Sequence, residues 1–235
     1  MKFKIAGEIQ KKYPDLKIGV VVARDITNRK SDPDLEQLKR VAEDKLQDSE
    51  LTSERLSENP FIAAWRDTYR SFGVKPKKYT PTAESLVKRV LKGNELPQIS
   101  VVVDAYLVVE LEHFLPIGGY DLDVIEGNIV LRFSPGNEPF TPLGGGSKET
   151  KPSEVVYSDD KRVLTVCWNF LDCDETKIIL NTKNFVLFIE AADPRIPVEA
   201  LKKATARLQQ VLEQFCPGIY KSFIADTSKV LEWKI

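Results

Sequence analysis

At 235 residues, with 42% apolar and 29% charged residues, the chain has the balance of a globular protein with a sizeable core, which excludes a disordered or collagen-like chain. Its 34 basic and 35 acidic residues nearly cancel, so no global charge favours polyanions. No apolar run approaches the ~20 residues of a membrane helix, and the N-terminus lacks the apolar stretch of a signal peptide, so we expect a cytoplasmic protein with no membrane partner.

Three cysteines and one histidine restrict the chemistry of the chain. Cys167, Cys173 and Cys216 show no Cys-x-x-Cys spacing, which is typical of reduced thiols in a core. His113 alone cannot form a multi-histidine metal site, and any Ser-His-Asp or Cys-His mechanism would have to use it. Neither a dinucleotide-binding glycine motif nor a phosphate-binding loop is present, so we expect no metal and no cofactor.

The N-terminal segment combines helix and strand patterns. Residues 3–13 predict a helix ended by Pro14, and residues 18–23 predict a strand. Asp32 is a suitable N-cap for a helix over 33–46. One face of that helix is apolar at spacings of three and four: Leu35, Leu38, Val41, Ala42 and Leu46.

Three further helices are expected next. The first covers residues 60–72 and ends at Gly73, and the second begins at Thr82 as its cap and stops at Gly93. Residues 101–111 are apolar enough for a buried strand. Their length and their helix-tolerant residues favour a buried helix instead.

β-Branched and aromatic residues dominate the second half of the chain. They predict five short strands separated by Gly, Pro, Asp and Asn turns, at residues 128–133, 154–158, 163–169, 177–180 and 185–191. An amphipathic helix over 197–215 follows and ends at Pro217-Gly218. We therefore predict an α+β fold in which N-terminal helices pack on a mixed, largely antiparallel sheet.

Charge is segregated along the chain although its sum is close to zero. Residues 66–92 carry eight basic and two acidic residues, whereas residues 104–126 carry six acidic residues and no Lys or Arg. The basic segment would attract a phosphate backbone. Its candidate RNA-binding residues are Arg66, Arg70, Lys77, Lys78, Lys88 and Arg89. The alternative is a solvated helical face whose charges pair with the acidic segment.

Residues 115–123 contain two adjacent glycines. Gly118 and Gly119 either leave backbone N–H groups open to a ligand or permit a tight turn, which is the commoner case. Asp121 and Asp123 lie two residues apart, but no third metal ligand accompanies them, so they favour a solvated loop.

A single acid interrupts the last apolar strand. Burial would raise the pKa of Glu190 unless a partner binds it, and a nearby arginine such as Arg195 is the ordinary structural solution. Cys167 would need a base to act as a nucleophile, and His113 beside Phe114 on an apolar element is read as structural.

Six segments in the same order resemble the B3/B4 domain, a module of the beta chain of bacterial phenylalanyl-tRNA synthetase that also occurs as free-standing proteins. They read AWRDTYRSFG at 64–73, PTAESLVKR at 81–89, LPQI at 96–99, VVDAY at 102–106, LPIGGYDLD at 115–123 and IEAA at 189–192. The resemblance covers about residues 60–215. It suggests three parts: an N-terminal helix-strand-helix extension of the same compact unit (1–59), a B3/B4-like domain (60–216) and a C-terminal tail packed on it (217–235).

In the synthetase, this domain is a second sieve that hydrolyses tyrosine wrongly attached to the phenylalanine tRNA. By position, Glu190 matches the family carboxylate that reads the substrate hydroxyl. The resemblance thus implies catalytic roles for Glu190 and Asn169. It also implies substrate contacts at Tyr106, Gly118, Gly119 and Trp168.

Two positions depart from the family pattern. Gly118 stands where the synthetase has a pocket histidine, and Tyr106-Leu107 occupies the stretch of a Thr-Asn pair. These departures remove two polar contacts, which argues against hydrolysis of a tyrosyl ester in particular.

The leading hypothesis is a free-standing aminoacyl-tRNA editing hydrolase whose partner is tRNA or aminoacyl-tRNA. The sequence that activates an amino acid with ATP is absent, so the chain is not a complete ligase. The alternative is a non-catalytic module that binds tRNA, another RNA or a small ligand with a degenerate editing pocket. Hydrolysis of another small ester or amide in the same pocket is a third reading.

Overall fold

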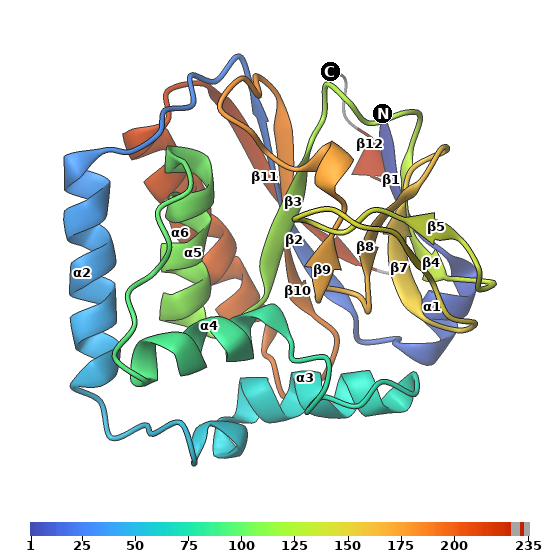
Figure 1. The fold of residues 1–235 in the computed structure, drawn as a ribbon, viewed down its shortest axis with the longest axis horizontal. Helices are drawn as coiled ribbons and strands as arrows, with labels where there is room; N and C mark the ends of the chain where they lie inside the picture. The colour runs from blue at the N-terminus through green and yellow to red at the C-terminus, as the bar shows by residue number, and fades with distance from the viewer. Residues whose placement is uncertain (227–230, 233–235) are drawn as a thin grey trace.

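The computed structural model describes residues 1–226 and 231–232, and it arranges them as two β-sheets with helices stacked against one of them (Figure 1). The inner sheet has four strands, and every neighbouring pair in it is antiparallel. Its strands, in spatial order, are β11 (Ile219–Asp226), β2 (Lys17–Arg24), β10 (Phe185–Ala191) and β3 (Ile117–Asp121).

The second sheet covers the other face of the inner sheet. Its strands, in spatial order, are β12 (Leu231–Glu232), β1 (Lys2–Ile5), β4 (Ile129–Phe133), β7 (Val155–Ser158), β8 (Val163–Val166) and β9 (Leu171–Asp172). Within the described chain, β1 and β4 are its one parallel pair. A two-stranded ribbon of β5 (Pro139–Phe140) and β6 (Lys148–Glu149) lies outside it. The fold is therefore α+β, with mixed, mostly antiparallel sheets.

The helices form layers on the open face of the inner sheet and at one end of it (Figure 1). Helix α6 (Val198–Phe215) packs on β2, β10 and β11, while α5 (Val101–His113) packs on α6 and β3. Helix α2 (Pro33–Gln47) covers α5 from outside. At the lower end in Figure 1 lie α4 (Thr82–Leu91), α3 (Pro60–Ser71) and the short η1 (Leu56–Glu58). Helix α1 (Gly7–Lys12) contacts β4, and η2 (Asp174–Thr176) follows β9.

Strand β10 lies at the centre of the molecule. All seven of its residues are buried, because α6 covers one face and the second sheet covers the other. Phe188 packs against Phe3 and Tyr157 on the side of the second sheet. On the other side, Gly19 of β2 lets α6 approach, since a Cβ there would lie 2.1 Å from the Thr205 hydroxyl. Any polar group on β10 must therefore find its partners inside the protein.

The N-terminal segment differs from its predicted helix. Residues 2–5 form β1 and only Gly7–Lys12 is helical. Phe3 and Ile5 are buried while Lys2 and Lys4 are exposed, a period of two that suits a strand between β4 and β12. The predicted helix over 3–13 was wrong because its apolar residues belong to two elements, β1 and α1, whose combined spacing resembles a helical period.

Two other expectations are corrected, and part of a third lies within the described residues. Residues 177–180 form no strand, and the Ile179 N–H instead bonds the Thr182 hydroxyl in a turn. The diglycine segment is not a bend but part of β3. The tail expected at 217–235 begins with β11, which pairs with β2 along its whole length, and residues 227–230 and 233–235 of that tail lie outside the described residues.

Several helix boundaries are confirmed. Asp32 accepts hydrogen bonds from the backbone of Asp34 and Leu35 at the start of α2, and Gly73 and Gly93 have the positive φ expected after a helix. The predicted strands at 128–133, 154–158 and 185–191 and the helices at 101–111 and 197–215 also match.

Two details of these helices differ from expectation. The N-cap of α4 is Pro81 rather than Thr82, and the part of the chain that the structure describes offers no hydrogen-bond partner to the buried Thr82 hydroxyl. Val41 is exposed, because α2 turns Lys39 and Glu43 inward instead.

The buried ion pair between Lys39 and Asp104 ties α2 to α5. Both side chains are fully buried, the Lys39 Nζ lies 3.3 Å from Asp104 Oδ2, and the same ammonium donates to the Pro97 carbonyl. Lys39→Met should lower the free energy of unfolding by about 3 kcal/mol, because Asp104 would be left as an uncompensated buried acid. Urea unfolding measures this change. Lys45→Met, an exposed lysine on the same helix, should leave the midpoint unchanged, and equal midpoints for both variants would contradict the assignment.

Candidate functional site

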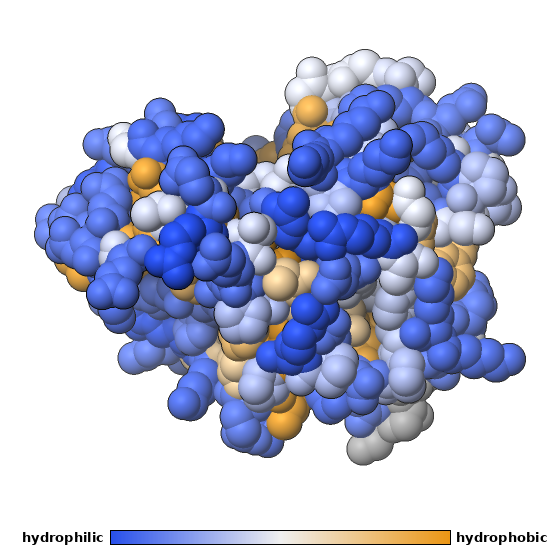
Figure 2. Space-filling model, turned by 90° about the horizontal axis from the view of Figure 1, so that it is seen from below, coloured by the Kyte–Doolittle hydropathy of each residue, from blue (hydrophilic) through white to orange (hydrophobic). Residues whose placement is uncertain are grey.

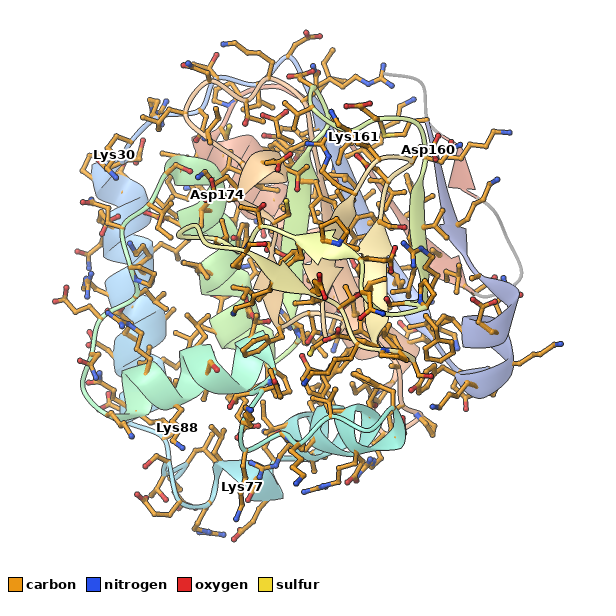
Figure 3. All side chains as sticks on the ribbon, turned by 45° about the vertical axis from the view of Figure 1, so that its right-hand side comes forward. Lys30, Lys77, Lys88, Asp160, Lys161 and Asp174 are labelled. Atoms are coloured by element: carbon orange, nitrogen blue, oxygen red, sulfur yellow. The ribbon has the colours of Figure 1, made fainter. Side chains whose placement is uncertain are left out.

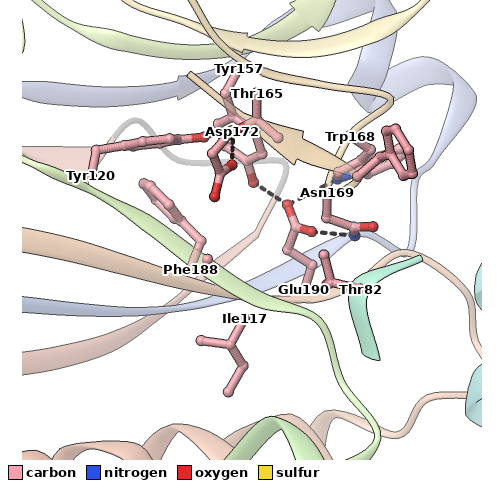
Figure 4. Close-up of a pocket in the computed structure, with 12 residues that line it drawn as sticks. Thr82, Ile117, Tyr120, Tyr157, Thr165, Trp168, Asn169, Asp172, Phe188 and Glu190 are labelled. Carbon is pink, nitrogen blue, oxygen red and sulfur yellow. Dashed lines mark hydrogen bonds between the residues drawn. The ribbon is translucent and has the colours of Figure 1, made fainter. Parts of the chain in front are cut away.

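A small cavity lies between the two sheets, beside the end of β10 (Figure 4). Its volume is about 40 Å³, enough for two or three water molecules or a small polar group. Twelve residues line it: Thr82, Ile117, Gly118, Tyr120, Tyr157, Thr165, Trp168, Asn169, Phe170, Asp172, Phe188 and Glu190. Both sheets and the start of α4 contribute walls, so only the tertiary fold creates this site.

The Glu190 carboxyl group of the cavity accepts three hydrogen bonds from protein side chains. Its Oε1 accepts hydrogen bonds from the Tyr157 hydroxyl and from Trp168 Nε1 at 3.0 Å, and its Oε2 accepts one from Asn169 Nδ2 at 2.7 Å. The side chain is 2% exposed. All three partners are neutral donors that suit a carboxylate, and Arg195 instead pairs with Asp193 and Asp67.

A tight turn after β8 presents two of these donors. Cys167 and Trp168 have φ values of 50° and 69°, a left-handed backbone conformation that residues other than Gly rarely adopt. The Trp168 ring is clamped edge-on by Tyr13 and Trp65, and the Tyr69 hydroxyl donates to Asn169 Oδ1. The Tyr69 bond fixes the orientation of the Asn169 amide, so that its N–H₂ faces Glu190.

A second carboxyl, Asp172 on β9, faces Glu190 across the cavity (Figure 4). Asp172 Oδ1 accepts the Thr165 hydroxyl at 2.6 Å, and Thr165 in turn contacts the Tyr120 hydroxyl at 2.6 Å. The described residues give Asp172 Oδ2 no hydrogen-bond donor, and this atom lies 3.8 Å from where a Cβ on Gly118 would sit. Asp172 therefore offers one oxygen to whatever enters the cavity.

A wider groove of about 490 Å³ continues outward from the cavity, with which it shares Thr82, Ile117, Phe170 and Asp172. Glu110 of α5 lines this groove and is 2% exposed, and the described residues give its Oε1 no hydrogen-bond partner. Tyr106 and Leu107 of the same helix also line it. The groove and the cavity together form one recess with a narrow inner end.

The inner cavity is acidic, and Arg89 is the one basic residue among the described residues that line the outer groove. Burial raises the pKa of Asp172 to about 6, of Glu190 to about 7 and of Glu110 to about 8, and repulsion from Asp172 adds to the rise at the two glutamates. Among the described residues, no Lys or Arg forms an ion pair with these carboxyls, and no cluster of three acids, histidines or cysteines that could hold a metal is found. The recess thus suits a ligand that carries a positive charge.

Replacing Glu110 by Gln should make the protein less sensitive to alkaline pH. The folded state raises the pKa of Glu110 from about 4.5 to about 8, so this group binds its proton more tightly when folded, and its stabilising effect is lost as pH rises between these values. We expect similar free energies of unfolding at pH 5 and a gain on the order of 1–3 kcal/mol for the variant at pH 9. Glu8→Gln on the exposed face of α1 is the control. Parallel pH curves for wild type and Glu110→Gln would contradict the prediction.

Four of the expected substrate and catalytic residues meet at the cavity, namely Glu190, Asn169, Trp168 and Gly118. Gly118 pairs with Phe188 of β10, which places the glycine and Glu190 on the same face of the inner sheet. Gly119 points to the opposite face, where a Cβ would meet Leu187, and it does not line the cavity. Tyr106 lies in the outer groove.

The residues expected to bind RNA do not all lie together. Arg66 pairs with Glu84, and Arg70 pairs with Asp67. Lys77 and Lys88 extend from the lower end of the molecule (Figure 3), where they line a separate hollow together with Arg66.

The two remaining RNA candidates differ from each other. Arg89 donates to the Glu95 carbonyl, whereas Lys78 lies over the Tyr79 ring. In the described residues no ion pair joins segment 66–92 to segment 104–126, so the alternative in which these two segments neutralise each other is wrong.

Sequence reasoning missed Asp172, Glu110 and the hydroxyl residues Thr165 and Tyr157. One signal was present: Glu110 interrupts an apolar helix that is buried all round, and a charge there requires a partner or a ligand. Asp172 carried no such signal, because its two-residue strand is recognisable only from its pairing with β8.

These features define a two-sheet α+β protein with an acidic pocket between its sheets. A family model described as the B3/4 domain matches residues 64–217, a span that includes the whole cavity lining. Because this match covers well over half of the chain, the chain belongs to the B3/4 domain family.

Curated relatives carry the same region as part of longer proteins. The phenylalanine–tRNA ligase beta subunit of Fusobacterium nucleatum is 32% identical over 106 residues, which are 45% of this chain and 13% of that protein. The subunit of Leifsonia xyli is 29% identical over 160 residues, which are 59% of this chain and 19% of that protein. The matched region thus spans less than a fifth of these relatives.

Among solved structures, an N-terminal fragment of the phenylalanyl-tRNA synthetase beta subunit from Pyrococcus horikoshii aligns with 97% of this chain and 54% of that chain, at a TM-score of 0.48 and 13% identity. In the described part of this chain, no helix combines the length and apolar character that crossing a bilayer requires.

Proposed function

We propose that the chain binds an aminoacyl group esterified to the 3′ end of a tRNA and hydrolyses that ester, as a free-standing editing hydrolase. The observation that carries this proposal is Glu190, a buried carboxylate held by three donors beside Asp172 in the B3/4 region. The curated relatives are beta subunits of a tRNA ligase, which supports a tRNA partner.

The charge of the recess fits the free end of an aminoacyl ester. Every such ester carries an α-ammonium group next to its carbonyl. Glu190 and Asp172 line the cavity, and neither forms an ion pair with a cation of the described chain. An ammonium between them would offset the cost of burying two acids, and aromatic walls from Tyr120, Tyr157 and Phe188 would stabilise the cation further.

The two parts of the recess would hold different parts of such a substrate. The inner cavity of about 40 Å³ accepts a small polar group, whereas the groove of about 490 Å³ has room for an amino-acid side chain. Leu86, Leu107 and Leu143 give that groove apolar surface, and Glu110 is its acid beyond the Asp172 that it shares with the cavity. The ester would then lie at the junction of the two, beside Asp172.

Hydrolysis requires a positioned water and no covalent nucleophile, because the ester is already labile. Asp172 Oδ2 accepts a proton from water as the water oxygen bonds to the ester carbonyl carbon. The bond from that carbon to the ribose oxygen then breaks, and the proton passes to the ribose oxygen. The products are a free amino acid and an RNA with a 3′-hydroxyl.

The cysteines take no part in this scheme. All three are buried, and burial together with the neighbouring Glu154 raises the pKa of the Cys167 thiol, which keeps it in the inert form.

A panel of aminoacyl-tRNAs, each carrying a radiolabelled amino acid, tests the proposal. Purified protein at sub-stoichiometric amounts should accelerate deacylation of at least one pair at pH 7.5 over the rate without protein. No acceleration with any pair would remove the hydrolase assignment.

A non-catalytic binding module is the second candidate, and one observation favours it. Gly118 has no side chain, so the cavity lacks the family histidine, and each Glu190 oxygen already has a protein donor. Retained binding of aminoacyl-tRNA, with deacylation equally slow in wild type and Glu190→Gln, would identify this function.

A further inference from the structure

A second hollow, which we call the lysine groove, lies next to the acidic recess and carries the opposite charge. It has a volume of about 380 Å³, and three exposed lysines line it: Lys75 and Lys78 from the loop after α3, and Lys151 from the loop before β7. In the described chain none of the three forms an ion pair with a carboxylate. Glu154 also lines the groove, but its oxygens accept bonds from the Cys167 thiol and the Lys151 backbone N–H.

Tyr79 forms an aromatic wall of this groove. The ammonium groups of Lys151 and Lys78 lie 5.0 and 5.4 Å from the centre of its ring, and Lys151 Nζ donates to the Tyr79 hydroxyl at 3.1 Å. These contacts hold two positive charges at the edge of one aromatic surface. Lysines around an aromatic ring are the combination with which proteins hold the phosphates and bases of single-stranded nucleic acid.

The same tyrosine connects the lysine groove to the acidic recess. The Tyr79 ring packs edge-on against Phe170 at 5.2 Å, and Phe170 lines both the inner cavity and the outer groove. One pair of rings therefore separates the lysines from Asp172. The molecular end that contains the loop after α3 is largely hydrophilic (Figure 2).

We propose that the lysine groove binds the phosphates of a single-stranded RNA 3′ end, with the terminal base against Tyr79 and Phe170. This proposal rests on the proposed function, because the 3′-linked aminoacyl group would then pass directly into the acidic recess. The order of charges matches such a ligand, since phosphates meet lysines and the ammonium at the 3′ end meets carboxylates. In this proposal the phosphates contact Lys75 and Lys151, and they do not contact Arg66 and Arg70, which form ion pairs with acids of their own segment.

Fluorescence anisotropy with an uncharged acceptor-stem RNA hairpin that ends in four unpaired 3′ nucleotides tests the groove. We expect Lys75→Glu/Lys78→Glu/Lys151→Glu to weaken binding at least tenfold and to lower the salt slope by about 2, as expected for three contacts to a single strand. Tyr79→Ala, which keeps the lysines, should weaken binding by about fivefold through lost stacking. A blunt hairpin without the unpaired nucleotides should bind weakly to wild type and should not respond to these changes.

Two control variants, each with three charge reversals, distinguish an effect of the lysine groove itself from a general effect of lost positive charge. Lys45→Glu/Lys202→Glu/Lys203→Glu changes exposed lysines of α2 and α6 by the same total charge and should alter affinity less than twofold. The variant Lys77→Glu/Lys88→Glu/Arg89→Glu probes the face expected from the sequence and should cost less than threefold. Equal losses in all three variants, or undiminished binding by the groove variant, would overturn the proposal, provided that thermal unfolding shows each variant folded.

The outcome is independent of turnover, because the hairpin carries no amino acid. If deacylation fails with every substrate but binding depends on the groove, the RNA site stands and the hydrolase assignment falls. If deacylation is retained while the groove variant binds RNA normally, the hydrolase stands and the groove proposal falls.

Discussion

Glu190→Gln is expected to reduce deacylation by about 10²-fold while the protein remains folded, because a fixed negative charge is removed from the cavity. The amide cannot satisfy the surrounding donors. Its N–H₂ would face either Asn169 Nδ2 or the donors Tyr157 and Trp168. Asn169 cannot simply turn its oxygen inward, since that oxygen accepts the Tyr69 hydroxyl.

The same substitution should also cost stability. Leaving buried donors without an acceptor costs about 1–3 kcal/mol, so a lower unfolding midpoint should accompany the lost rate. Deacylation of the aminoacyl-tRNA identified in the panel measures the rate, and urea unfolding measures the stability. Glu199→Gln, an exposed acid on α6, serves as the control for both. An unchanged rate in Glu190→Gln would show that Glu190 is only a structural acceptor.

Asp172→Asn is expected to reduce the deacylation rate by about 10²-fold and to remove the acidic limb of the pH profile. Burial raises the pKa of Asp172 to about 6, and the base form is the carboxylate. The rate of the wild type should therefore rise from pH 5 to pH 7, with Glu190 ionising over the upper part of that range because its pKa is about 7.

The controls for Asp172 test its role as a base. Asp174→Asn lies two residues away on η2, where the acid pairs with Lys177 outside the cavity, and it should leave the profile intact. Thr165→Val removes the donor to Asp172 Oδ1, so the pKa of Asp172 should rise further and the acidic limb should move to higher pH. An Asp172→Asn enzyme with the wild-type profile would assign proton transfer elsewhere.

The most predictable parts of the fold were the elements whose signals are local. Helix α6 and the cap at Asp32 follow from spacing and capping chemistry alone, and β10 follows from a bounded run of apolar residues. β1, β3 and β11 were missed because their identity as strands depends on neighbours far away in the chain. β3 in particular contains two glycines, which read as a turn until β10 is placed beside them.

By itself, the sequence determined the α+β class, and it singled out Glu190 as a candidate, because a lone acid in an apolar strand is recognisable without coordinates. Only the tertiary structure decided which groups surround that acid. Asp172, Tyr157 and Trp168 come from separate strands and turns of the second sheet, and they reach Glu190 only because the two sheets pack face to face. Burial in that interface raises the pKa values of both acids, repulsion from Asp172 adds to the rise at Glu190, and no local pattern of residues encodes either effect.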